Sequence, residues 1–89
     1  ISPLRESISL KDSEIKKLIS SIKKIIQKAI DLGGSSISDY VNAKGDLGYF
    51  QNNFKIYGRE KLNCLLCNEL IKKIKQNGRS TFYCPKCQK

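Results

Sequence analysis

Four cysteines constrain the fold of this chain more than any other residues. Cys64, Cys67, Cys84 and Cys87 form two C-x-x-C pairs separated by 16 residues, and the 89 residues include no other cysteine and no histidine. Two thiolates in each short loop can converge on one ion, and this spacing lies within the range typical of structural zinc sites. The sequence therefore predicts one structural zinc ion held by four sulfurs.

A pair of disulfides in a small secreted scaffold is the alternative reading of four cysteines. Both pairs lie near one end, so disulfides would leave the first 63 residues without a crosslink. We therefore expect reduced cysteines and a cytoplasmic protein. The sequence shows no signal-peptide pattern and no apolar run of about 20 residues, so we expect no membrane helix and no membrane partner.

Basic residues are concentrated around the cysteines. The formal net charge is +9, and residues 64–89 carry six basic and one acidic side chain, whereas residues 1–34 carry seven and four. Four thiolates on a divalent ion would leave the cysteine region at about +3. A polyanion is the natural partner for this charge, and nucleic acid is the leading candidate. The chain begins at Ile1 rather than methionine, which suggests a piece of a longer protein.

An amphipathic helix is predicted in the first third of the chain. Ser9 and Asp12 match the pattern of a helix start, and Gly33 with Gly34 supplies the stop. Apolar residues recur every three or four positions between them and form one stripe: Ile15, Leu18, Ile19, Ile22, Ile25, Ile26, Ala29 and Ile30. Five lysines lie opposite the stripe, as a solvated or a phosphate-binding face: Lys16, Lys17, Lys23, Lys24 and Lys28.

Residues 35–53 are rich in glycine, serine, asparagine and aspartate, so we expect mostly loop, followed by a short strand at residues 54–57. Farther on, runs of strand formers at 70–76 and 79–83 flank Asn77-Gly78, the dipeptide typical of a two-residue hairpin turn. A hairpin between two cysteine loops is a zinc ribbon. The predicted fold is thus a small α+β domain with an N-terminal helix, a loop and a C-terminal zinc-ribbon hairpin.

Arg79 follows the turn directly and is expected at the tip of the hairpin, farthest from the metal. A planar guanidinium there suits phosphate, and Lys72, Lys73 and Lys75 raise the local positive potential. From the pattern alone, a phosphate contact and simple solvation of Arg79 both remain open.

The chain resembles the C-terminal end of the bacterial formamidopyrimidine-DNA glycosylase family. Members of that family end in R-x-T-F/H-Y-C-x-x-C-Q-K/R, which corresponds to residues 79–89, and Y-G-R and G-Y-F elements occur upstream in the same order as at 57–59 and 48–50. The resemblance implies that residues 1–34 are the second half of a helix-two-turn-helix region. It further implies a lesion-capping loop within residues 35–60 and a zinc ribbon at 61–89.

Several roles follow from the resemblance. It implies excision of oxidised purines from double-stranded DNA, with cleavage at abasic sites, and one structural zinc ion on the four cysteines. Arg79 would grip backbone phosphates near the damaged nucleotide, flanked by the three hairpin lysines. The loop after the glycine pair would close over the everted base, and it comprises Ser35, Ser36, Ile37, Ser38, Asp39 and Tyr40.

The resemblance places the bond-breaking residues outside this sequence. The family uses an N-terminal proline amine, an adjacent glutamate and an asparagine from the first half of the helix-two-turn-helix. Pro3 lies instead where the family has the linker between the two helices. We therefore expect a catalytically inactive, otherwise monomeric DNA-binding end whose partner is the rest of the same protein. The alternatives are a freestanding zinc-ribbon accessory protein of transcription or translation, and a structural domain that binds a protein.

Overall fold

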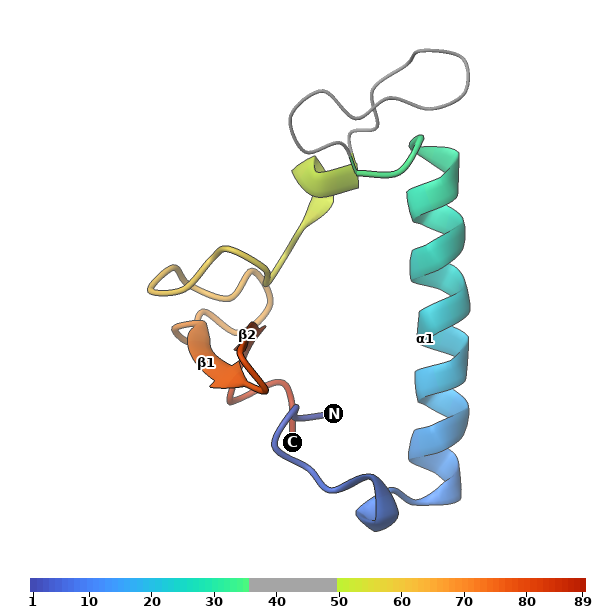
Figure 1. Cartoon of the computed structure of the whole chain (residues 1–89), viewed down its shortest axis with the longest axis vertical. Coiled ribbons are helices and arrows are strands. Elements are labelled where there is room, and N and C mark those ends of the chain that lie inside the picture. The colour runs from blue at the N-terminus through green and yellow to red at the C-terminus, as the bar shows by residue number, and fades with distance from the viewer. Residues whose placement is uncertain (36–49) are drawn as a thin grey trace. The chain divides into compact units, whose positions relative to one another are not determined.

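The computed structural model describes residues 1–35 and 50–89. Its elements are η1 (Ser7–Ser9), α1 (Asp12–Asp31), η2 (Phe50–Asn53), β1 (Lys72–Gln76) and β2 (Arg79–Tyr83), as Figure 1 shows. The chain forms two compact units: Ile1–Lys11 together with Lys55–Lys89, and Asp12–Phe54. Among the described residues, one α-helix and one two-stranded antiparallel sheet confirm the predicted α+β class.

Helix α1 begins at Asp12, with Asp12 and Glu14 in its first turn, where carboxylates suit the positive end of the helix dipole. The predicted start at Ser9 is wrong. Ser9 belongs to η1, where its hydroxyl donates a hydrogen bond to the carbonyl oxygen of Glu6 at 2.6 Å. That local bond occupies the side chain that would otherwise cap the helix.

The glycine pair ends α1 as predicted. Gly33 and Gly34 have φ of 81° and 78°, a region that favours glycine. The Gly33 N–H donates to the Ile30 carbonyl at 2.9 Å and the Gly34 N–H to the Ala29 carbonyl at 2.7 Å. These two bonds form a Schellman motif. The Gly34 carbonyl oxygen then accepts a hydrogen bond from the Phe50 N–H at 2.9 Å. This bond brings together the described residues on either side of residues 36–49.

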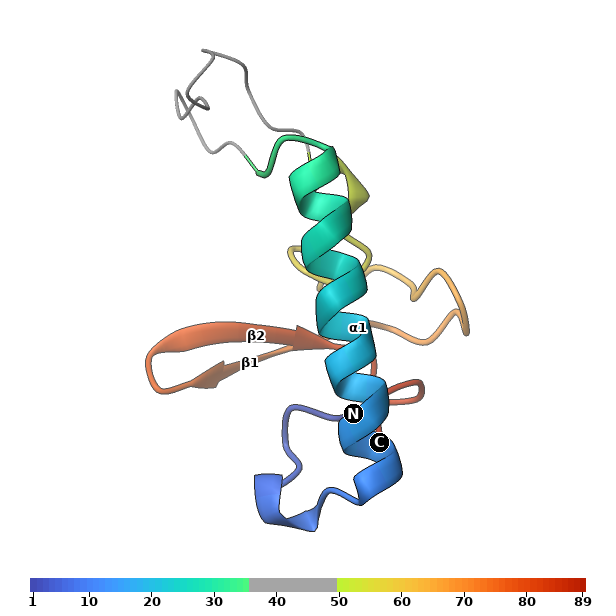
Figure 2. The ribbon, with the colours of Figure 1, turned by 90° about the vertical axis from the view of Figure 1, so that its right-hand side faces the viewer.

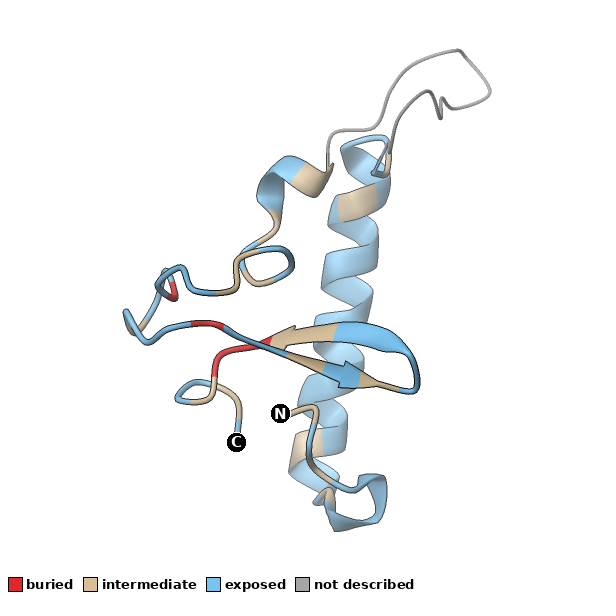
Figure 3. Cartoon of the chain, turned by 60° about the vertical axis from the view of Figure 1, so that its left-hand side comes forward, coloured by how far each residue is buried: buried red, intermediate tan, exposed pale blue. Residues whose placement is uncertain are grey.

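The apolar stripe predicted for α1 is present but is not buried by the described residues. None of the helix residues is classed as buried, and Figure 3 shows α1 largely in the colour of exposed residues. The exposed fraction of its isoleucine and leucine side chains runs from 39% at Leu18 to 63% at Ile30. Within the part of the chain that the structure describes, no helix has the length and apolar character needed to cross a bilayer.

Strands β1 and β2 form the predicted hairpin, whose two strands run side by side in Figure 2. The register pairs Gln76 with Arg79, and the turn residues Asn77 and Gly78 have φ of 51° and 78°. Two consecutive positive φ values are what a two-residue type I′ turn requires. The first strand starts at Lys72, later than the predicted residue 70, because Leu70 forms a bridge with Asn63 instead.

The strand predicted at residues 54–57 is wrong, and a turn takes its place. The Arg59 N–H donates to the Ile56 carbonyl at 3.1 Å, and Gly58 has a φ of 73°. The aromatic residues of this segment pack through their rings: Phe54 stacks edge-on against Phe50, and Tyr57 against Phe82, at centroid separations of 5.7 and 4.8 Å. The segment before it, predicted as loop, contains the short helix η2.

The core of the ribbon is very small. Among the described residues the buried apolar side chains are Cys64, Ile71, Tyr83 and Cys84. Three of them, Cys64, Ile71 and Cys84, form one cluster. Partly buried Ile56, Cys67 and Phe82 pack against this cluster. So little apolar burial offers limited stabilisation, which makes a metal ion at the cysteines important for folding.

Candidate metal centre and nucleic-acid interface

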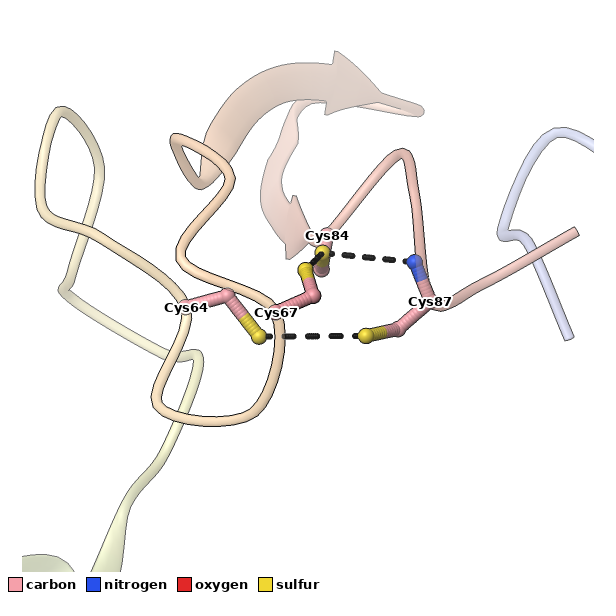
Figure 4. Close-up of side chains that lie close together, drawn as sticks. All are labelled: Cys64, Cys67, Cys84 and Cys87. Carbon is pink, nitrogen blue, oxygen red and sulfur yellow. Dashed lines mark hydrogen bonds between the residues drawn. The ribbon is translucent and has the colours of Figure 1, made fainter.

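The four cysteines converge at the base of the hairpin (Figure 4). The Sγ atoms of Cys64 and Cys87 lie 3.9 Å apart, those of Cys67 and Cys84 lie 3.4 Å apart, and all four lie within 4.8 Å of one another. A disulfide would bring two sulfurs to about 2.0 Å. A tetrahedral ion with Zn–S bonds of about 2.3 Å places its sulfurs about 3.8 Å apart. The geometry fits one zinc ion and rejects the disulfide alternative.

Two loops of the same design present the sulfurs. In the first loop, the Asn68 N–H donates to the Cys64 carbonyl at 2.9 Å, and in the second the Gln88 N–H donates to the Cys84 carbonyl at 3.0 Å. A backbone N–H of each loop also points at the first sulfur, with the Cys87 N–H 3.4 Å from the Cys84 Sγ (Figure 4). Such N–H donors stabilise thiolates, so each loop is shaped for an ionised ligand.

The ionisation of the thiols supports the same assignment. Hydrogen bonds from the backbone N–H groups of Cys67 and Leu66 lower the pKa of Cys64 to about 6. The hydrogen bond with Cys67 raises the pKa of Cys87 to about 12. One thiol of the cluster thus ionises readily, while hydrogen bonding to Cys67 and burial oppose ionisation of Cys87. Only a bound cation lets all four ionise together, and four soft sulfur donors suit zinc.

The Tyr-Gly-Arg segment holds the first cysteine loop in place. Tyr57 packs on Phe82 of β2, and the Arg59 Nη2 donates to the Asn63 carbonyl at 3.0 Å, one residue before Cys64. Asn63 in turn donates through Nδ2 to the Asn68 carbonyl at 2.9 Å, which braces both ends of the loop. These contacts assign the segment a structural role in supporting the metal centre.

The basic residues of the hairpin divide between its two faces. Residues directly opposite in an antiparallel pair share a face and neighbouring residues alternate, so Lys72 lies on the face of Arg79, whereas Lys73 and Lys75 lie on the other. Arg79 is exposed, and no other described residue binds its guanidinium. Lys73 lies 3.9 Å from a carboxylate oxygen of Glu60 and 5.6 Å from the Phe82 ring centre. The Arg79 guanidinium is therefore more available to bind a ligand than the Lys73 ammonium group.

Sequence reasoning missed three side chains that join the ribbon to the first residues of the chain. The Gln76 Nε2 donates to the Pro3 carbonyl at 3.0 Å, the Gln88 Nε2 to the Ile1 carbonyl at 3.2 Å, and the Arg5 Nη1 to the Lys89 carbonyl at 3.2 Å. Gln88 also accepts from the Cys84 N–H at 2.9 Å. The C-Q-K motif at the end of the sequence could have drawn attention to Gln88. No neighbouring residue, however, indicated that its side chain bonds to the Ile1 carbonyl.

The predicted lesion-capping loop falls almost entirely outside the described residues. Ser35 is described and exposed, and residues 36–40 are not described. The loop assignment and the DNA contacts of the hairpin therefore stay predictions.

Comparison with known proteins covers both the helix and the ribbon. Residues 62–89 match the model of a zinc finger found in FPG and IleRS. The chain is 46% identical over 89 residues to a formamidopyrimidine-DNA glycosylase of Listeria monocytogenes, covering all of this chain and 33% of that protein. It therefore spans about a third of the length of such relatives.

Solved structures give the same correspondence. A complex of Lactococcus lactis Fpg with DNA containing an abasic site matches the whole chain with a TM-score of 0.87 and 45% identity, over 32% of that protein. A complex of MutM with DNA containing carbocyclic 8-oxo-G matches 99% of the chain with a TM-score of 0.86 and 44% identity, over 31% of that protein. The resemblance inferred from the sequence is confirmed, and so is the zinc-finger character of the cysteine region.

Proposed function

We propose that this chain is the DNA-binding end of a base-excision repair glycosylase. The observation that carries the proposal is the match of the entire chain, helix and ribbon together, to proteins solved as complexes with abasic or damaged DNA. A chain that shared only the zinc ribbon with these proteins would match over the ribbon and not over the helix. The concentration of positive charge in residues 64–89 and the free guanidinium of Arg79 suit a phosphate backbone.

In this proposal the ribbon contributes binding and not bond cleavage. An ion with four sulfur ligands has no open position for water, so its role is structural. Extruding a nucleotide from the duplex costs a few kcal/mol, and contacts to the bent backbone offset that cost. The exposed apolar stripe of α1 is suited to packing against the rest of a longer polypeptide, which would carry the glycosylase and abasic-site lyase chemistry on oxidised purines.

Binding of the zinc-loaded 89-residue chain to three fluorescent duplexes tests the proposal. The duplexes are identical except at one position, which carries an abasic-site analogue, 8-oxoguanine or guanine. We expect the abasic duplex to bind tightest, because its backbone is easiest to bend. Equal affinity for all three would contradict a repair function and favour a general nucleic-acid-binding ribbon.

Incubation of the chain with the same duplexes tests whether this part of the protein cleaves DNA. We expect neither base release nor strand nicking, and gel electrophoresis under denaturing conditions would show any cleavage. Nicking by the pure chain would overturn the assignment of the chemistry to residues outside this sequence. A preparation of the Arg79→Ala variant that does not nick the same duplexes would show that the activity belongs to the chain and not to a contaminant.

The alternative of an accessory protein has one observation in its favour, because the same zinc-finger family is also found in IleRS. That likeness is limited to residues 62–89 and leaves α1 and the glycine pair unexplained. Tighter binding to a structured RNA than to the abasic duplex would favour this alternative.

A further inference from the structure

Gln76 connects the tip of the hairpin to the N-terminal segment. It is the last residue of β1, and the register places it directly opposite Arg79. Its Nε2 donates to the Pro3 carbonyl oxygen at 3.0 Å, and its Oε1 accepts from the Thr81 hydroxyl at 2.8 Å. Both polar atoms of the side chain are thus used, one within the hairpin and one outside it.

These contacts lie on the face of the hairpin that carries Arg79. Gln76 and Arg79 are cross-strand partners, and Thr81 lies two positions beyond Arg79 on the same strand, so all three share one face. Lys75 and Ser80, the next pair along the register, lie on the opposite face. A contact through Gln76 therefore restrains the side of the tip from which the Arg79 side chain extends.

The tip needs such a restraint because the metal fixes only the base of the hairpin. A two-stranded hairpin alone is marginally stable in water and can bend or twist. The contacts of Lys73 with Glu60 and of Phe82 with Tyr57 hold the second strand pair from the base. Among the described residues, the hydrogen bond from Gln76 to Pro3 is the contact nearest the turn that reaches outside the hairpin.

We propose that Gln76 is a positioning residue for Arg79, acting by anchoring the tip of the hairpin to the backbone of Pro3. The inference rests on the proposed DNA-binding role of Arg79. An anchored tip presents the guanidinium in one place, so less conformational freedom is lost when it binds a phosphate. The Thr81 hydroxyl orients the Gln76 amide so that its NH₂ group faces Pro3.

Gln76→Met tests this, because methionine keeps the length of the side chain and removes both hydrogen bonds. In the zinc-loaded 89-residue chain we expect binding to the abasic-analogue duplex to weaken about threefold to tenfold, the scale of one or two net hydrogen bonds. Thr81→Val, which removes only the hydroxyl, should weaken binding in the same direction by less. Ser80→Ala, between Arg79 and Thr81 on the same strand but on the opposite face, should leave the affinity unchanged.

The same substitution in an Arg79→Ala background separates positioning from general stabilisation. If Gln76 acts through Arg79, Gln76→Met changes the affinity less than twofold once Arg79 is absent. An equal loss in both backgrounds, or no loss in the chain with Arg79, would overturn the inference and leave the DNA-binding proposal intact. An Arg79→Ala chain that binds as well as the original would overturn both.

NMR relaxation of the Asn77 and Gly78 amides gives a readout that does not depend on DNA. We expect increased motion at these two amides in Gln76→Met and Thr81→Val, with one zinc ion still bound per chain. Unchanged motion in both variants would overturn the inference. Thr81→Val provides this test even if Gln76→Met fails to fold.

Discussion

Arg79 is the residue whose replacement tests the hairpin most directly. The side chain is exposed and bonds to no other described residue, so Arg79→Ala removes no contact from the described fold. We expect it to weaken binding to the abasic duplex by roughly 1 to 3 kcal/mol, the worth of a charge-assisted hydrogen bond. Fluorescence anisotropy measures the affinity, and circular dichroism with zinc analysis confirms the fold.

Lys75→Ala is the matched control for Arg79, because Lys75 is a cation of the same hairpin on its other face. We expect a smaller loss of affinity from it, since a lysine there contributes charge without the planar fork of arginine. Equal losses for the two variants would mean that only the net charge of the ribbon matters, contrary to a specific phosphate contact by Arg79.

Gly78 makes the turn possible, and its backbone conformation is the reason. Its φ is +78°, and a Cβ built there meets no atom within 4 Å, so the cost of Gly78→Ala is purely conformational. We expect the zinc-loaded chain to lose about 1 to 2 kcal/mol of unfolding free energy, the penalty of a left-handed conformation for a residue with a Cβ. Urea unfolding followed by tyrosine fluorescence measures the loss.

Asn77→Gly is the comparison for that measurement, because Asn77 also has a positive φ, of 51°. Glycine adopts this conformation easily, so we expect a change of only a few tenths of a kcal/mol. If Gly78→Ala proved as harmless as Asn77→Gly, the turn would not have the type I′ geometry that holds Gln76 opposite Arg79.

At the scale of elements, the hairpin and the cysteine loops form one metal-dependent unit. The buried cluster beneath them contains two of the four cysteines, so removal of zinc both frees the loops and places repelling or protonated thiols in the core. We expect chelation to abolish amide protection in β1 and β2, and added zinc to restore it. Hydrogen exchange followed by mass spectrometry measures this, and elemental analysis should give one zinc per folded chain.

Acidification should have the same effect as chelation, because the ligands bind zinc as thiolates and protons compete for them. Loss of zinc and of hairpin protection should therefore coincide as the pH falls. A ribbon that stays protected after complete loss of metal would show that the small apolar core suffices, contrary to our expectation.

Local chemistry explains which elements were predictable from the sequence. The hairpin depends on Asn77 and Gly78 at adjacent positions, the end of α1 on two consecutive glycines, and the metal loops on cysteines three apart. Each signal acts within a few residues, so tertiary structure does not need to be known. These predictions were confirmed for that reason.

The predictions that failed concern residues whose side chains had a competing partner. Ser9 bonds to Glu6 instead of capping α1, and Tyr57 packs on Phe82 instead of pairing in a strand. Gln76 and Gln88 were not singled out because their partners lie 73 and 87 residues away in the sequence. No periodicity or spacing within one sequence reports a contact of that range.

At the scale of the whole molecule, the exposed apolar stripe and the most basic part of the sequence belong to different elements. The apolar stripe belongs to α1, whereas the ribbon residues 64–89 carry six basic side chains and one acidic. An interface made mainly of phosphate contacts depends on salt, because each neutralised phosphate releases condensed counterions. The salt dependence of binding therefore reports how many cations of the chain meet the DNA.

We expect the logarithm of the association constant for duplex DNA to fall linearly with the logarithm of the salt concentration, by roughly 0.9 for each phosphate contacted. Arg79→Ala should reduce the magnitude of that slope by about 0.9. Affinities measured across a series of potassium chloride concentrations give the slope for each protein. A slope unchanged by Arg79→Ala, together with a lower affinity, would place Arg79 at a base or an aromatic surface instead of a phosphate. Lys73→Ala should change the slope less, because Glu60 and Phe82 already engage that ammonium group.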